Sequence, residues 1–256
     1  MAIETSQIRF GEGFLDDHAG RIISNPQIAL VELVANSWDA GSRRVDIKWP
    51  KKEEEYFEIV DDGTGMVKDE FERIWAELNY NRVKMQGHSV KFPGPSTTIK
   101  RSAYGRNGKG RHSLFCFSNE YNVETWKDDI SSSFHIKRSW GESPYEITFV
   151  KQGAKKGHGT KIWCNILNNY IGESEVQELL GSKFITDPAF VIYINDHKID
   201  LLDLQDGVEQ EEYDIPGEEE NVRILRIDSQ KTGRVKQRTP LQAAGHVRAG
   251  HQLFEL

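Results

Sequence analysis

Three polar residues on one predicted helix have the types and spacing that metal-assisted hydrolysis would need. Glu32, Asn36 and Asp39 stand at positions i, i+4 and i+7, so they share one face of an α-helix. A carboxylate can activate a water molecule, and an amide oxygen one turn away can bind a hard cation such as Mg²⁺. A helix whose polar stripe faces solvent explains the same spacing equally well. The helix alone leaves both interpretations open.

The acidic, glycine-rich turn DDGTGM at residues 61–66 is a second candidate. Glycine lets a backbone approach a ligand closely, here at Gly63 and Gly65. The carboxylate of Asp61 beside them could accept a hydrogen bond from an exocyclic amine. An ordinary Asp-Gly turn is the alternative interpretation.

A third candidate is GRNGKG at residues 105–110, followed by a short helical pattern in RHSLFCFS. Backbone N–H groups at a helix start favour phosphate. The motif is not a Walker A loop, because Gly110 rather than Ser or Thr follows Lys109. It does not open a Rossmann unit, because a long loop precedes it.

The charges around this motif favour a polyanionic ligand. Between Leu78 and Asn119 the chain has no Asp or Glu, although its formal net charge is −7. The basic residues of this stretch are Arg82, Lys84, Lys91, Lys100, Arg101, Arg106, Lys109 and Arg111. A triphosphate or a nucleic acid would suit these charges.

Local patterns predict the elements that position these candidates. Asn25 is a good N-cap, Pro26 suits the first helical position and Gly41 suits the stop, so a helix is predicted between Asn25 and Gly41. Further patterns predict helices over 68–79, 111–118 and 174–180, and strands over 43–49, 56–60, 121–126, 133–138, 145–151, 160–166, 190–194 and 222–227. Residues 82–104 are predicted as a loop that is functional or disordered, and the acidic segment 206–220 as a solvated loop.

The totals indicate an ordinary globular protein. The chain has 256 residues, of which 37% are hydrophobic and 29% charged. Its two cysteines stand in apolar stretches without metal-ligand spacing, so buried, reduced thiols are expected. The sequence has no signal-peptide core and no apolar run approaching the roughly 18 residues of a membrane span. We therefore expect a cytoplasmic protein without a membrane partner.

The ordered set ELVANSWDA, DDGTGM, GRNGKG and GHGT, the last at residues 157–160, resembles the GHKL superfamily. That superfamily includes DNA gyrase B, the ninety-kilodalton heat-shock chaperone, histidine kinases and MutL, with the related MORC ATPases. The resemblance covers roughly residues 20–170. It implies a Bergerat fold, an α+β two-layer sandwich with a mixed, mostly antiparallel sheet, helices on one face and a mobile ATP lid. The implied division is an N-terminal arm at 1–20, an ATP-binding domain at 21–228 with a lid at 82–107, and the start of a following domain or linker at 229–256.

The resemblance also implies roles for individual residues, with ATP and Mg²⁺ as cofactors. Glu32 matches the general base, Asn36 the Mg²⁺ ligand and Asp61 the carboxylate that binds adenine. Thr160 matches a threonine that supports adenine binding through Asp61 and water, and Asp39 lies near the pocket. The other residues implied in nucleotide binding are Ala40, Gly63, Gly65, Met66, Gly105, Arg106, Asn107, Gly108, Lys109 and Gly110.

The function implied by the resemblance is Mg²⁺-dependent ATP hydrolysis that drives lid closure and N-terminal dimerisation. A DNA-associated machine of the MutL or MORC kind, in repair or defence, is the preferred setting, with DNA as a partner of the full-length protein or of the basic lid. A chaperone-like ATPase and a non-hydrolysing nucleotide sensor are the alternatives. A histidine kinase is disfavoured, because Glu32 is present and only about 25 residues precede its helix. The isolated chain is expected to be weakly active if a phosphate-contacting lysine lies beyond residue 256.

Overall fold

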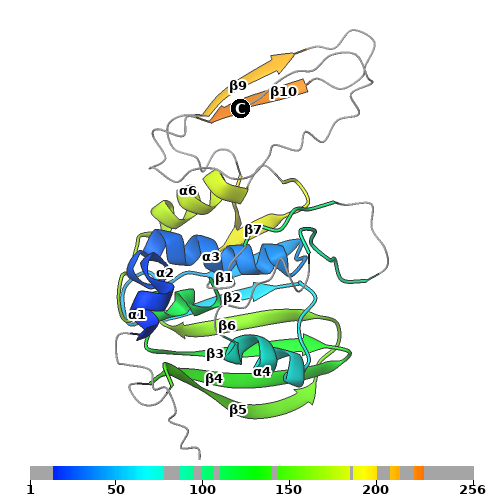
Figure 1. Cartoon of the computed structure of the whole chain (residues 1–256). Helices are drawn as coiled ribbons and strands as arrows, with labels where there is room; N and C mark the ends of the chain where they lie inside the picture. Colours follow the sequence, from blue (N-terminus) through cyan, green and yellow to red (C-terminus); the bar gives the residue numbers. More distant parts are fainter. Residues whose placement is uncertain are drawn as a thin grey trace, which may run out of the picture.

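One sheet of eight strands forms the frame of the described chain (Figure 1). The strands are β1 Arg44–Lys48, β2 Tyr56–Asp61, β3 Glu120–Lys127, β4 Ile130–Arg138, β5 Tyr145–Ala154, β6 Gly159–Asn165, β7 Val191–Ile194 and β8 His197–Lys198. Their spatial order is β5-β4-β3-β6-β2-β1-β7-β8, and within this sheet only the β1–β7 pair is parallel. The structure is a computed structural model that describes residues 14–77, 87–94, 100–105, 110–139, 143–184, 187–200, 208–213 and 222–227. Predictions that fall elsewhere, including much of 82–107 and all of 229–256, lie outside the described residues.

The strand register gives the sheet one apolar face. Ile47 lies opposite Ile59, Ile59 opposite Ile162, and the row continues through Val123 to Phe134. Alternate residues of a strand point to the same side, so this row and its neighbours two residues away face the core. Val123 and Phe134 are fully buried. A register slip of one residue would turn the row to the opposite face, so burial of this row fixes the pairing.

The opposite face of the sheet is polar. Lys48 lies opposite Glu58, and their charged groups are 2.9 Å apart. Lys161 also pairs with Glu58, and the hydroxyl of Tyr56 donates to the same carboxylate. Burial alone would raise the pKa of Glu58, but the hydrogen bonds from Lys161, Tyr56 and Lys48 outweigh it and lower the pKa to about 2. This face therefore carries compensated charges rather than a second core.

Helices cover the apolar face. They are α1 Phe14–Ala19, α2 Arg21–Ser24, α3 Pro26–Asp39, α4 Lys68–Ala76, the 3-10 helix η1 Gly110–Cys116, and α6 Glu173–Phe184. Phe71 of α4 stacks on Phe134 of β4 with ring centroids 4.0 Å apart. Trp38 of α3 packs against Phe184 of α6 at 5.9 Å, and α3 and α4 lie over the same side of the sheet in Figure 1. The predicted two-layer fold with a mixed, mostly antiparallel sheet is confirmed.

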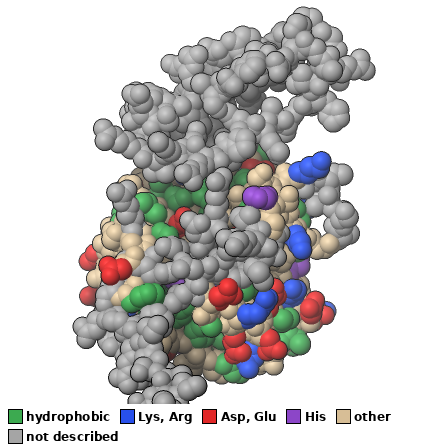
Figure 2. All heavy atoms as spheres, in the orientation of Figure 1, with side chains coloured by type: hydrophobic (Ala, Val, Ile, Leu, Met, Phe, Trp, Pro, Cys, Tyr) green, Lys and Arg blue, Asp and Glu red, His purple; other side chains and the backbone are tan. Residues whose placement is uncertain are grey.

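Charges of both signs are interspersed around α4. Lys68 pairs with Glu72 at 3.6 Å, and Lys127 with Glu70 at 3.2 Å. Figure 2 shows acidic and basic side chains mixed on this part of the visible surface. Among the described residues around α4, charges of both signs therefore replace the single-sign field that attracts a polyanion.

The beginning of the described chain is helical. Leu15 and Ala19 of α1 are buried in the core, so residues 14–19 pack onto the domain. The predicted arm at 1–20 otherwise lies outside the described residues and stays a prediction. No helix in the described part of the chain is long and apolar enough to span a membrane.

The prediction of a solvated loop over 206–220 is wrong for its first half. Residues Val208–Tyr213 form β9, which pairs antiparallel with β10, Val222–Ile227. The register places Glu209 opposite Arg226 and Glu212 opposite Arg223. The high acidic content of this segment therefore did not exclude a strand.

Candidate functional site

Helix α3 begins and ends where its sequence predicts. The Asn25 side chain accepts a hydrogen bond from the backbone N–H of Ile28 at 3.0 Å, and Pro26 occupies the first turn. The helix stops before Gly41, whose φ of 75° is a left-handed conformation that glycine adopts readily. A Cβ at Gly41 would lie 2.2 Å from the carbonyl oxygen of Lys91, so this glycine also admits the loop 87–94.

The polar stripe of α3 is half-buried. Ala29, Leu30, Val31, Leu33, Val34, Ala35, Ser37 and Trp38 of the same helix are buried. Glu32, Asn36 and Asp39 are all of intermediate exposure. Burial raises the pKa of the Glu32 carboxyl, and the neighbouring charge of Asp39 raises it further. The surroundings of the stripe therefore favour a partly enclosed site over a solvated face.

The start of η1 lies against this stripe. A Cβ at Gly110 would lie 2.4 Å from Oε2 of Glu32 and 3.4 Å from Oδ1 of Asn36. The absence of a side chain at Gly110 is what lets the backbone reach the carboxylate and the amide. The structure thus brings together three of the predicted site residues; Arg106, Asn107, Gly108 and Lys109 lie outside the described residues.

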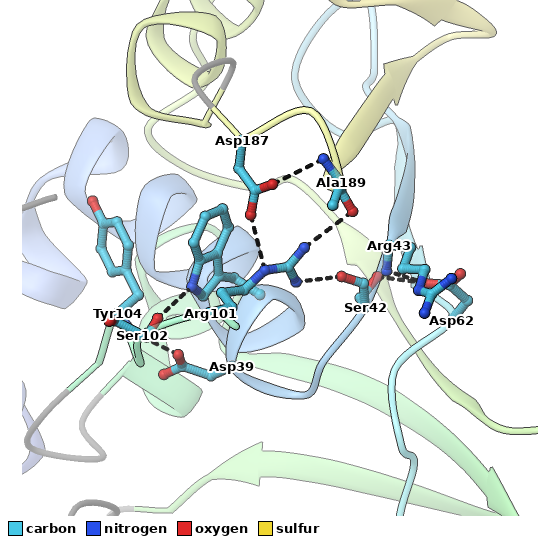
Figure 3. Close-up of polar contacts among 10 residues, drawn as sticks. Asp39, Ser42, Arg43, Asp62, Arg101, Ser102, Tyr104, Asp187 and Ala189 are labelled. Atoms are coloured by element: carbon cyan, nitrogen blue, oxygen red, sulfur yellow. Dashed lines mark hydrogen bonds and ion pairs between the residues drawn. The ribbon is translucent and has the colours of Figure 1, made fainter. Parts of the chain in front are cut away.

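Asp39 holds the backbone just before the GRNGKG motif (Figure 3). One carboxylate oxygen accepts from the N–H of Tyr104 at 2.7 Å, and the other accepts from Gly105 at 2.9 Å. Hydrogen bonds from N–H groups to a carboxylate are among the stronger ones in proteins. Asp39 therefore ties the first glycine of the motif to the end of α3, and its predicted place near a metal stays a prediction.

Asp61, the last residue of β2, belongs to a second part of the site, away from Gly110. It lies opposite Thr160 on the helix-facing side of the sheet and is 9% exposed. Its carboxylate accepts from the N–H of Gly63 at 2.9 Å and from the hydroxyl of Ser37 at 3.0 Å. Burial raises the pKa of Asp61 to about 6, even though the bonds from Gly63 and Ser37 act in the other direction. Ser37 belongs to α3, so the helix with the polar stripe also contacts Asp61.

The two acids of DDGTGM have different environments. Oδ1 of Asp62 accepts from the hydroxyl of Ser42 at 2.6 Å and from the N–H groups of Arg43 at 2.7 Å and Arg44 at 2.9 Å. Asp62 therefore holds the chain after α3. Asp61 alone of the pair faces the helix.

The glycines of this turn allow backbone to pack without side chains. A Cβ at Gly63 would lie 2.7 Å from the Cβ of Ala40. Gly65 has a φ of 59°, and a Cβ there would lie 2.0 Å from the carbonyl oxygen of Trp126. The turn therefore lies directly on the end of α3 and on β3, and its predicted contact with a ligand stays a prediction.

Sequence reasoning missed three residues of this region. Ser37 stands within the motif ELVANSWDA of α3 but was not singled out as a site residue. Thr125 occupies an inward position of β3, where its hydroxyl oxygen accepts from the N–H of Met66 at 2.8 Å and lies 3.5 Å from the hydroxyl of Thr160. The inward alternation of β3 was the available signal for Thr125.

His158 is the third missed residue. Its Nδ1 lies 2.9 Å from the carbonyl oxygen of Asp62 and 2.8 Å from that of Gly63. Because both partners are acceptors, Nδ1 carries the proton and donates. His158 thereby supports the glycine turn from the β6 side.

The donor atoms near Gly110 suit a hard cation. Among the residues that the structure describes, no group of three His, Cys, Asp or Glu side chains could hold a metal ion. One amide oxygen and one carboxylate near a glycine backbone match the sparse protein ligation of Mg²⁺, which takes further oxygens from phosphate and water. A chelating site made of side chains alone would need more ligands than these residues supply.

The sequence is similar to a family of ATPases and to DNA mismatch repair proteins. A family model for the histidine kinase-, DNA gyrase B-, and HSP90-like ATPase matches residues 23–160. The DNA mismatch repair protein MutL of Persephonella marina is 26% identical over 230 residues, which cover 85% of this chain and 41% of that protein. The DNA mismatch repair protein PMS1 of Arabidopsis thaliana is 28% identical over 107 residues, covering 42% of this chain and 10% of that protein. The mismatch repair endonuclease pms1 of Dictyostelium discoideum is 30% identical over 101 residues, covering 40% and 9%. The chain spans less than half the length of these relatives.

Proposed function

The chain belongs to the histidine kinase-, DNA gyrase B- and HSP90-like ATPase family, and from this premise we propose that it binds and hydrolyses ATP with Mg²⁺ as the ATPase module of a larger, MutL-like protein. One observation carries the proposal. Helix α3 contacts Asp61 through Ser37, and it contacts Gly110 through Glu32 and Asn36. A single rigid element thus spans a base-binding end and a phosphate-binding end.

The Asp61 end fits an adenine ring. The carboxylate of Asp61 accepts hydrogen bonds from Ser37 and Gly63, and a carboxylate has lone pairs left to accept another from an exocyclic amine. With a pKa of about 6, Asp61 is mostly ionised at neutral pH and so available as an acceptor. The turn at Gly63 and Gly65 would lie beneath the ring, Met66 would pack against it, and Thr160 would support the same hydrogen bonds through water.

The Gly110 end fits the phosphates and the cation. Bound Mg²⁺ would neutralise charge on the phosphates, with Asn36 as its protein ligand. Glu32 would orient the attacking water and take its proton, and its raised pKa makes it a better base near neutral pH. Phosphate contacts are proposed for the backbone of Gly105, Gly108 and Gly110, and for Arg106, Asn107 and Lys109.

The wider task is proposed from the relatives. The MutL and PMS1 proteins are named for DNA mismatch repair, which favours a DNA-associated repair or defence task over a chaperone-like one. Closure of the lid at 82–107 and ATP-dependent pairing of two chains would couple hydrolysis to that task. DNA contact is proposed for the full-length protein.

Titration calorimetry with a non-hydrolysable ATP analogue tests binding, with EDTA replacing Mg²⁺ as the control. Phosphate release with protein in excess over ATP detects a slow turnover. We expect saturable, Mg²⁺-dependent binding and phosphate release that disappears in Glu32→Ala. An analogue that does not bind would refute the proposal, and binding without any phosphate release would indicate a nucleotide sensor instead.

A further inference from the structure

Arg101 is a buried cation inside the segment 82–107 that was predicted to be a mobile lid. Its side chain is 1% exposed. The guanidinium donates from Nε to Asp187 at 3.1 Å, from Nη2 to the carbonyl oxygen of Ala189 at 3.0 Å, and from Nη1 to the carbonyl oxygen of Ser42. A buried charge is costly unless it is paired and hydrogen-bonded, and Arg101 has both kinds of compensation.

These contacts join three distant segments (Figure 3). Arg101 belongs to residues 100–105, Ser42 follows α3, and residues 187–190 connect α6 to β7. The guanidinium carbon also lies over the Trp38 ring at 4.4 Å from the ring centroid. Arg101 therefore fixes its own segment to the end of α3 and to the strand region beyond α6.

The rest of residues 101–105 is held to α3 as well. The indole N–H of Trp38 donates to the carbonyl oxygen of Ser102 at 2.9 Å. Asp39 then accepts from the N–H groups of Tyr104 and Gly105. This row of contacts leads directly into the GRNGKG motif.

We propose that Arg101 is a positioning residue for nucleotide binding, which anchors residues 101–105 so that Asp39 can hold Tyr104 and Gly105 in place. The inference rests on the proposed function. According to this proposal, residues 101–105 are held in a fixed position, although they belong to the segment predicted as a mobile lid. The position of Gly105 relative to α3 is then set by the buried cation of Arg101.

The chemistry of the contact requires arginine. Three acceptors lie around one planar group, and that group also stacks on an aromatic ring. A lysine ammonium carries the same charge but cannot offer a planar fork to three separate acceptors. Arg101→Lys is therefore the informative variant, with Arg101→Met removing the charge altogether.

The matched control is Glu58→Gln, which disrupts a buried ionic group on the opposite face of the sheet. The first measurement is hydrogen exchange of the Tyr104 and Gly105 amides in nucleotide-free protein. We expect exchange to become about tenfold faster or more in Arg101→Lys, because loss of fixed contacts lowers the free energy of local opening. Exchange should stay at the parent rate in Glu58→Gln.

The second measurement is KM and kcat for Mg-ATP. In Arg101→Lys we expect KM to rise about tenfold with a smaller change in kcat, since Glu32 and Asn36 keep their places on α3. If Arg101 had a merely structural role, Arg101→Lys and the control Glu58→Gln would both have a lower melting temperature, and their KM values would be alike. Parent-like exchange at Tyr104 and Gly105, or parent-like KM in Arg101→Lys, would overturn the inference.

Different results would refute the proposed function and the proposed role of Arg101. A parent protein that binds no ATP analogue would refute the proposed function. A parent that binds ATP normally, with Arg101→Lys and Arg101→Met matching its KM, would refute only the role of Arg101.

Discussion

Substitution of Asp61 by asparagine should stabilise the empty protein while it weakens ATP binding. Asparagine has the same shape, its carbonyl oxygen can accept from the Gly63 N–H, and its NH₂ can donate to Ser37 Oγ. The variant can therefore keep the hydrogen bonds with Gly63 and Ser37 while it removes a buried charge.

The size of the effect follows from the pKa of Asp61. Its ordinary value is 3.8 and its value in the fold is about 6, a difference of about two units at about 1.4 kcal/mol per unit. The folded protein therefore binds a proton more tightly than the unfolded chain does. As pH rises from about 4 to 6, the free energy of unfolding falls by up to about 3 kcal/mol, and the loss is complete above that window.

Asp61→Asn has no such titration, so its free energy of unfolding at pH 7.5 should exceed that of the parent by about 1–3 kcal/mol. The difference should nearly vanish at pH 4, where Asp61 is protonated in the folded parent. Urea denaturation followed by tryptophan fluorescence at both pH values measures it in the absence of nucleotide. ATP binding at pH 7.5 should weaken by about 1.5–3 kcal/mol, the usual contribution of a hydrogen bond to a charged group.

Glu58→Gln provides a control of opposite sign on the same strand. The pKa of Glu58 is lowered, so its charge stabilises the fold at neutral pH and the variant should be less stable there. Because Lys48 is solvent-exposed, a loss of only about 1 kcal/mol is expected. Our reasoning about Asp61 would be refuted if Asp61→Asn were the less stable protein at pH 7.5, or if its advantage were the same at pH 4.

The remaining predictions concern turnover and backbone packing. Glu32→Ala should bind ATP as the parent does and release no phosphate; retained phosphate release would remove Glu32 from its proposed role. Gly110→Ala should place a methyl group 2.4 Å from Oε2 of Glu32, the movable end of a flexible side chain. We therefore expect kcat to fall about tenfold or more, with the melting temperature nearly unchanged; unchanged kcat would contradict it. Gly65→Ala meets the fixed carbonyl oxygen of Trp126 at 2.0 Å and a φ of 59°, so urea denaturation should report a loss of more than about 2 kcal/mol.

Local signals predicted α3 well. Asn25, Pro26 and Gly41 define its ends through short-range hydrogen bonding and backbone conformation, which a sequence displays directly. The alternating strands of the main sheet were also predicted, because a half-buried sheet needs an apolar residue at every second position. The resemblance to the GHKL superfamily, which rested on ordered motifs, was confirmed by the family match.

Contacts between distant residues could not be predicted. Arg101 and Asp187 are 86 positions apart, so nothing in the basic segment indicated that one of its cations is buried. The predicted site residues Asp39 and Asp61 were identified by type, yet their partners Tyr104 and Ser37 emerge only from packing. The strand β9 was missed because its strongly acidic composition indicated a solvated loop.

The parallel pairing of β1 with β7 affects how the protein is made. The two strands are separated by more than 140 residues, and β1 directly follows the helix that carries Glu32 and Asn36. While the ribosome is still synthesising the middle of the chain, β1 is an open edge with unpaired backbone groups. The segment matched by the family model, 23–160, ends before β7. A folded unit that keeps the β1–β7 pairing therefore extends at least through Ile194, and a shorter nascent chain exposes the β1 edge to aggregation.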